Sequence, residues 1–211
     1  MAAQIDKTID ASPQLVIRQI KEWAEILINF EAKNKYELQT LSGEKLGYII
    51  ERAGSLLATL KRLFLRSHRP LDIDILDNDG SKIYHLSRKF FLLFSDLNIA
   101  DKDGHKLGSI HRRFGIIYKK YDICDKYGNP FAHIQAPIWR LWTFPITNRT
   151  GQNLGVITKK WQGLLREAFT DADSFVIDYG KSAWQTPQKT IVLCAAISID
   201  FDFFEDNQGN N

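Results

Sequence analysis

The chain has 211 residues, of which 44% are hydrophobic and 25% charged, as is typical of one folded domain with a substantial core. The formal net charge of +3 is too small to indicate nucleic acid as a partner. Cys124 and Cys194 form no CxxC pair, so neither a disulfide framework nor a cysteine zinc site is indicated. No secretory signal is visible, so we expect a reducing, cytoplasmic location.

The N-terminal part reads as a polar leader followed by a helix. Residues 1–11 are expected to be flexible, and Ser12-Pro13 is typical of a helix start. The apolar residues at helical spacing are Leu15, Ile20, Trp23, Ile26, Leu27 and Phe30. This pattern predicts an amphipathic helix that ends near Ala32.

Five glycines mark a repeat along the middle of the chain: Gly43, Gly80, Gly104, Gly128 and Gly151. Each follows a short strand-like run, and an apolar residue stands three positions after each. Glycine supplies the positive φ that tight hairpin turns demand. Segment 71–75 alternates apolar and polar residues, which predicts a strand with one solvated face. Five hairpins predict an antiparallel sheet that is closed or nearly closed.

Segment 53–69 is apolar at helical spacing and rich in basic residues. Its candidate lipid-binding residues are Leu60, Lys61, Arg62, Phe64, Arg66 and Arg69. A basic amphipathic helix suits an anionic membrane surface, where each Lys or Arg contributes about 1 kcal/mol. A helix that caps one end of the barrel, with its basic face in water, explains the pattern equally well.

The run Phe90-Phe91-Leu92-Leu93-Phe94 has two readings, a buried strand or an apolar membrane contact, and we expect the strand. The five histidines are scattered, and no P-loop, GxSxG or dinucleotide motif is present. We therefore do not expect an enzyme that makes or breaks covalent bonds.

The C-terminal apolar stretch begins at Thr186-Pro187, a typical helix start. Segment 191–196 is apolar without a period, as in an element buried on all sides, whereas alternation over 197–203 is typical of a strand. A membrane span needs about 20 apolar residues. The apolar run over 191–204 has only 14 positions and contains Asp200 and Asp202, each costing about 2.5–3.5 kcal/mol at mid-bilayer. We expect it to lie inside the fold, where Asp200 needs a partner.

Segment 157–178 (ITKKWQGLLREAFTDADSFVID) resembles the signature block of the phospholipid scramblase family, with its Trp-x-Gly run followed by Leu-Arg-Glu-Ala-Phe-Thr-Asp-Ala-Asp. Segments 17–38 and 195–205 are also similar to this family. The resemblance leaves out only about the first dozen residues and the tail after Asp206. It indicates a single domain over 12–206 and a disordered tail over 207–211.

The family implies a mainly β, tubby C-terminal-like fold: a closed antiparallel barrel of about twelve strands around a central hydrophobic C-terminal helix, with an N-terminal amphipathic helix. The residues expected in that central helix are Ile191, Val192, Leu193, Ile197, Ile199, Asp200 and Phe201. The family also implies calcium-activated, ATP-independent movement of phospholipids between leaflets by a protein peripheral to the plasma membrane.

The resemblance places a calcium loop at the end of the signature block. Its candidate ligands are Asp171, Asp173, Phe175, Ile177 and Tyr179, with Asp178 as a substitute. Val176 stands where an EF-hand loop has Gly, and Ser182 stands where it has a bidentate Glu. Calcium binding should then be weak, about millimolar or worse. The poor match favours a simpler reading, in which Asp171 and Asp173 cap backbone N–H groups of a helix-to-strand turn.

Two functions remain open. The resemblance implies a scramblase that acts on phospholipids, anionic ones among them. Because one short central helix offers no path for a headgroup, the mechanism would require homo-oligomers or surface insertion. The alternative is a soluble tubby-like module that binds anionic lipids or a protein partner without transport.

Overall fold

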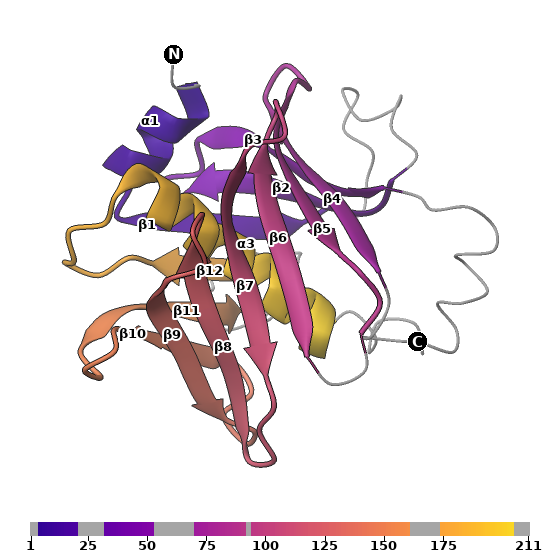
Figure 1. Cartoon of the computed structure of the whole chain (residues 1–211). Coiled ribbons are helices and arrows are strands. Elements are labelled where there is room, and N and C mark those ends of the chain that lie inside the picture. Colours follow the sequence, from indigo (N-terminus) through magenta and orange to yellow (C-terminus); the bar gives the residue numbers. More distant parts are fainter. Residues whose placement is uncertain (1–3, 21–31, 53–69, 92–93, 161–173, 205–211) are drawn as a thin grey trace.

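The computed structural model describes residues 4–20, 32–52, 70–91, 94–160 and 174–204 (Figure 1). The helices are α1 (Gln4–Ala11) and α3 (Thr186–Phe203). The first six strands are β1 (Gln14–Gln19), β2 (Ala32–Thr40), β3 (Lys45–Arg52), β4 (Leu71–Asp77), β5 (Lys82–Arg88) and β6 (Ser95–Asp101). The others are β7 (Lys106–Arg113), β8 (Tyr118–Asp125), β9 (Pro130–Pro137), β10 (Thr143–Thr147), β11 (Asn153–Lys160) and β12 (Ser174–Asp178).

The twelve strands form one closed antiparallel barrel in which each strand pairs with its neighbours in sequence. β1 closes the barrel, because it pairs with β2 on one side and with β12 on the other. The predicted mainly β fold, a closed barrel around the C-terminal helix, is confirmed.

The five glycine turns predicted from the sequence are all present, with φ between +83° and +88°. In the turn at Gly104 the glycine N–H donates to the carbonyl oxygen of Asp101 at 3.1 Å, and the Asp101 N–H donates to that of His105 at 3.0 Å. The Asp101 carboxylate also accepts the backbone N–H groups of Asp103 and His105, so it fixes the turn from inside.

Because the strands run up and down in sequence order, the barrel has two unlike ends. The five glycine turns lie at one end, called here the turn end. The connections β1–β2, β3–β4, β5–β6, β7–β8, β9–β10 and β11–β12 all leave from the other end, called here the loop end (Figure 1).

α3 runs through the middle of the barrel (Figure 1). Ile191 and the five residues after it, to Ala196, are each at most 1% exposed, which explains why this stretch is apolar without a period. Gly108 of β7 leaves room for the helix because it has no side chain; a Cβ there would lie 2.6 Å from Cδ1 of Ile191. The predicted central-helix residues are all buried within this element.

The N-terminal prediction was wrong in two respects. Residues 4–11 form α1 rather than a flexible leader, because Ile5 and Ile9 are buried against the core and α1 packs on α3. Residues 14–19 form β1 rather than the start of a helix, because hydrogen-bonded ladders on both sides outweigh the helical spacing of their apolar residues. The rest of the predicted helix, residues 21–31, and the expected tail, residues 207–211, lie outside the described residues.

Two strand predictions also need correction. The run that begins at Phe90 is not a buried strand, since β5 ends at Arg88 and the side chains of Phe90 and Phe94 are 45% and 55% exposed. In β4, Asp72 is exposed as expected, but Asp74 is buried on the outer face. Arg52 Nε donates to its carboxylate at 2.5 Å and His85 Nδ1 lies 2.9 Å from it, which compensates the burial.

Candidate functional site

The last turns of α3 carry two buried carboxylates that the barrel wall satisfies. Asp200 is 6% exposed. It accepts the hydroxyl of Tyr36 at 2.7 Å and the ammonium of Lys159 at 3.0 Å. The predicted need for an internal partner is confirmed, and the contacts tie α3 to β2 and β11.

Asp202 lies on the next stretch of the same helix and faces a different part of the wall. It accepts Nη1 of Arg88 at 2.6 Å and the hydroxyl of Tyr121 at 2.7 Å, and Nη1 of Arg112 lies 3.8 Å away. Burial, and then the Asp202 charge, raise the pKa of Tyr121 well above its usual value, so the hydroxyl stays a donor. The need of Asp200 for a partner was predictable from the sequence, but the wall residues that bind the two carboxylates were not identified; basic and tyrosine residues at inward strand positions are the signal that points to them.

The end of α3 is surrounded by aromatic rings and two buried lysines. Trp142 stacks on Phe204 with ring centroids 5.5 Å apart. Lys159 Nζ lies 4.4 Å from the Phe204 ring, and Lys119 Nζ lies 4.8 Å from the Phe203 ring. Burial lowers the pKa of Lys119.

In the described ranges, no helix has both the length and the apolar character needed to span a bilayer.

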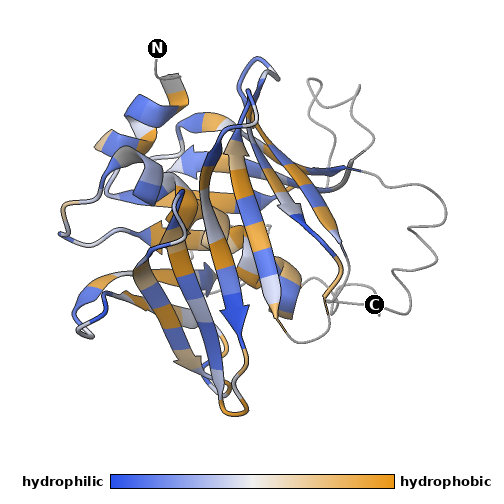
Figure 2. Ribbon diagram, in the orientation of Figure 1, coloured by the Kyte–Doolittle hydropathy of each residue, from blue (hydrophilic) through white to orange (hydrophobic). Residues whose placement is uncertain are grey.

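Exposed apolar side chains gather at the loop end. The apolar loop tips, as we call them, are Phe90, Phe94, Phe114, Ile116, Ile117, Ile138, Trp139 and Leu141, between 45% and 79% exposed. They belong to the β5–β6, β7–β8 and β9–β10 connections, which are consecutive along the barrel rim. The turn between β7 and β8 is orange at the bottom of Figure 2. A contiguous set of exposed large apolar residues is typical of an interaction surface.

The described calcium-ligand candidates do not converge on one point. Phe175, Ile177 and Tyr179 point into the barrel and are at most 3% exposed. Asp178 lies on the opposite face, where it accepts Nε2 of Gln14 at 2.6 Å and the N–H of Gly180 at 2.7 Å. β12 pairs with strands on both sides, so the ladders use its backbone carbonyls. These residues do not fit an oxygen-rich calcium site.

The remaining candidates, Asp171 and Asp173, and the whole basic segment 53–69 lie outside the described residues. Chain connectivity still places their attachment points. Segment 161–173 joins β11 to β12, and segment 53–69 leads from β3 toward β4. Both connections start and finish at the loop end, the end that carries the apolar loop tips.

Two groups of acidic and histidine residues at the described surface have structural partners. Asp101, Asp103 and His105 belong to the glycine turn described above, where the Asp101 carboxylate is used by backbone N–H groups. In the second group, Asp72 and Asp74 pair with the guanidinium of Arg52, and His85 Nδ1 lies 2.9 Å from the Asp74 carboxylate.

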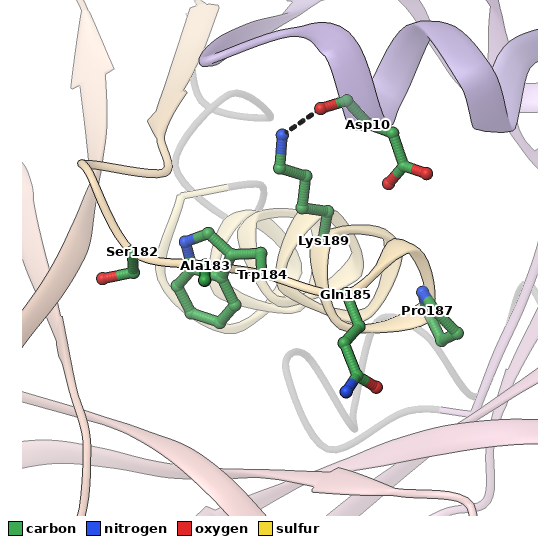
Figure 3. Close-up of a pocket in the computed structure, with 7 residues that line it drawn as sticks. All are labelled: Asp10, Ser182, Ala183, Trp184, Gln185, Pro187 and Lys189. Atoms are coloured by element: carbon green, nitrogen blue, oxygen red, sulfur yellow. Dashed lines mark hydrogen bonds between the residues drawn. The ribbon is translucent and has the colours of Figure 1, made fainter.

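A cavity of about 660 Å³ lies where the chain enters α3 (Figure 3). Its lysine, Lys189, donates to the backbone carbonyl oxygens of Ile9, Asp10 and Ser12 at 3.3, 2.6 and 2.9 Å. Trp184 Nε1 donates to the carbonyl oxygen of Tyr179 at 2.6 Å. Because Lys189 caps the C-terminal carbonyls of α1, its hydrogen bonds secure α1 to α3.

The chain is similar to several known proteins. It is 26% identical to Altered inheritance rate of mitochondria protein 25 of Saccharomyces cerevisiae over 95% of this chain and 73% of that protein. It is 24% identical to a phospholipid scramblase family protein of Schizosaccharomyces pombe over 92% of this chain and 60% of that protein. It is 27% identical to phospholipid scramblase 1 of Mus musculus over 96% of this chain and 62% of that protein. The chain thus spans less than two thirds of the last two relatives.

An X-ray structure of an Arabidopsis thaliana protein aligns with 90% of this chain and 92% of its own, with a TM-score of 0.47 and 10% identity, a likeness that carries no argument about function. The Scramblase family model matches residues 2–206, a range that contains every described strand of the barrel and its central helix. This chain therefore belongs to the scramblase family.

Proposed function

We propose that this chain moves phospholipids between the two leaflets of a membrane, without ATP and in response to calcium, from a position at the membrane surface. The apolar loop tips carry the proposal, because they gather at one end of a barrel that belongs to the scramblase family. Large aromatic and aliphatic side chains beside basic ones suit the boundary between headgroups and acyl chains.

The loop end also has the charge that an anionic membrane attracts. Lys89, Arg113 and Lys120 lie in or beside the same connections as the apolar loop tips. Segment 53–69, with Lys61, Arg62, Arg66 and Arg69, starts and finishes there. At about 1 kcal/mol per basic residue near an anionic surface, this charge orients the loop end toward the membrane.

Transport in this proposal breaks and forms no covalent bond. A headgroup has to cross about 30 Å of hydrocarbon. α3 gives it no path within one barrel, since the wall covers its sides and binds its carboxylates. The proposed route is therefore a bilayer locally disturbed by the inserted loop tips, or a surface between copies of the chain in a homo-oligomer.

The test is reconstitution of the purified chain in vesicles with a fluorescent phospholipid in both leaflets and a membrane-impermeant quencher added outside, without nucleotide. With calcium, we expect the quencher to remove all of the fluorescence. Without calcium, we expect it to remove only the share from the outer leaflet. Loss of only the outer-leaflet share in both conditions refutes transport. A soluble dye trapped in the vesicles, and retained throughout, shows that they do not leak.

Calcium dependence in this proposal rests on Asp171 and Asp173. The double variant Asp171→Ala/Asp173→Ala should abolish the calcium response while vesicle binding persists. Glu44→Ala/Asp103→Ala, in two exposed turns at the other end of the barrel, is the matched control and should keep the response. A response retained in the first variant removes these two residues from the calcium site.

The alternative is a module that binds anionic lipids or a protein partner and does not transport. The enclosure of α3 favours it, because Asp200 and Asp202 are held by the wall rather than directed toward a lipid path. Vesicle binding with outer-leaflet quenching alone, at every calcium concentration, would identify this module.

A further inference from the structure

A small cationic pocket lies at the loop end, beside the end of α3. Its volume is about 270 Å³. The basic residues that line it are Arg112, Arg113, Lys119 and Lys120, from the end of β7 and the start of β8. No acidic residue is among its described lining residues; the others include Phe91, Phe114 and Ile138.

Arg112 and Lys119 are the inner cations of the pocket, and neither has a carboxylate at hydrogen-bond distance among the described residues. Nη1 of Arg112 is buried and donates no hydrogen bond there, and the nearest recorded carboxylate oxygen, of Asp202, is 3.8 Å away. Asp202 already accepts Arg88 and Tyr121 at 2.6 and 2.7 Å. A buried guanidinium donor without an acceptor carries a desolvation cost that an anion would relieve.

Lys119 stands against the same ring as Arg112. Its Nζ lies 4.8 Å from the centre of Phe203, and Arg112 Cζ lies 5.1 Å from it. Lys119 is 8% exposed, and its one recorded hydrogen bond, to the carbonyl oxygen of Arg140, is long at 3.4 Å. The ammonium is desolvated and, in the described part of the chain, has no ion-pair partner. The outer Arg113, by contrast, is paired with Asp122 at 2.7 Å.

The size and rim of the pocket narrow the ligand class. It lies below the range of about 300–1,000 Å³ that encloses a drug-sized molecule, so it suits a headgroup rather than acyl chains. Guanidinium and ammonium groups together bind phosphate oxygens well. Phe114 and Ile138 belong both to the pocket lining and to the apolar loop tips, so an acyl chain could leave the pocket along apolar side chains.

We infer that Arg112 and Lys119 form the inner part of a binding site for a phosphate monoester or diester, with Lys120 at its outer side. The site takes the headgroup of a phospholipid when the loop end is on a membrane, an assignment that rests on the proposed function. A free phosphate compound offers the same chemistry, and the experiment below separates the two sources.

The binding test has two arms on the full chain in about 0.1 M salt. One arm titrates inorganic phosphate and follows the backbone amide signal of Gly115, which lines the pocket, with Gly104 at the turn end as internal reference. The other sediments the protein with vesicles of phosphatidylcholine and phosphatidic acid at roughly 4:1, or with phosphatidylcholine alone. A saturable Gly115 shift with a still Gly104, or sedimentation that requires phosphatidic acid, is the expected result.

Variants connect the binding to the pocket. Arg112→Gln/Lys119→Met should weaken whichever arm is positive by about tenfold or more, since each charged hydrogen bond contributes on that scale. Lys106→Gln, an exposed lysine at the turn-end start of β7, is the matched control and should bind like the wild type. Lys119→Arg keeps the charge and should retain binding, which separates loss of charge from loss of fold.

Each outcome decides a point. A Gly115 shift without vesicle binding assigns the site to a free phosphate compound; vesicle binding lost in the double variant assigns it to a lipid headgroup. No response in either arm, or equal binding by wild type and double variant, overturns the site. If the double variant unfolds, Lys119→Met alone, which removes a buried charge and keeps an apolar stem, makes the same comparison. Failure of lipid transport with phosphate binding intact refutes the proposed function and leaves the site.

Discussion

The ion pair between Arg88 and Asp202 gives the sharpest test of how α3 is held in the barrel. The side chains of Arg88 and Asp202 are 1% and 0% exposed, and Nη1 and Oδ1 are 2.6 Å apart. Asp202→Asn preserves the shape of the side chain but removes the negative charge that faces Arg88, and Arg112 at 3.8 Å. Removing one partner of a buried pair costs about 3–5 kcal/mol.

For a chain of this length each 1 kcal/mol changes the melting temperature by about 2–4 °C, so we expect Asp202→Asn to lower it by roughly 6–20 °C. Circular dichroism gives the melting temperature, and urea denaturation gives the free energy of unfolding. Asp103→Asn is the matched control, because its side chain is 59% exposed and its ion pair with Lys102 is at the surface. The control should stay within about 0.5 kcal/mol of the wild type.

A double replacement tests the cause of the loss. Arg88→Met/Asp202→Leu removes both charges together and should be less destabilising than Asp202→Asn alone, because the guanidinium closest to position 202 no longer faces an empty partner position. The reasoning is refuted if Asp202→Asn loses less than about 1 kcal/mol, or if the double variant is the less stable of the two.

Three further predictions concern the pH dependence of stability, the packing of α3 and the loop end. Burial raises the pKa of Cys194 above its usual 9.0, so the folded state keeps a proton that the unfolded chain releases, and stability falls as the pH rises above about 9. In Cys194→Ala the unfolding free energy, measured by urea denaturation, should fall with pH less steeply than in the wild type, by about 1.4 kcal/mol per pH unit. Equal slopes in the two proteins would contradict this. Gly108→Ala places a Cβ 2.5 Å from the carbonyl oxygen of Cys124 in β8 and 2.6 Å from Cδ1 of Ile191 in α3, and should cost about 1–3 kcal/mol of unfolding free energy, whereas a loss below about 0.5 would show that β8 and α3 can both shift. Ile116→Ser/Trp139→Ser should reduce sedimentation with anionic vesicles, while Leu41→Ser/Tyr127→Ser at the turn end should not; equal effects of the two pairs would remove the loop end as the membrane-facing surface.

The barrel could be predicted because its tight turns depend on residues that are local in the sequence. A glycine at each tight turn, with a short polar residue able to cap the backbone, requires no tertiary information. The N-terminal segment had no such marker. Leu15 was counted in a helical spacing, but it lies in β1, which closes the barrel between β2 and β12, a long-range pairing that periodicity does not contain.

The candidate site was predictable only in part for the same reason. The position of Asp200 within an apolar stretch showed that it needs a partner, but Tyr36 and Lys159 are distant in sequence, and only the closed sheet brings them to it. The run at Phe90 was read as a strand because its composition is apolar. Its residues instead follow the end of β5, and their exposure depends on a barrel end that the sequence does not delimit.

The order of the elements along the chain has a consequence for synthesis. The ribosome releases all twelve strands of the barrel wall before α3, so their inner faces have no central helix to pack against until α3 has emerged. Nascent or prematurely terminated chains that lack α3 would expose the apolar inner faces of their strands and should depend on chaperones or be degraded. A nonsense mutation a few codons before residue 186 should therefore be as damaging as one near the start of the gene.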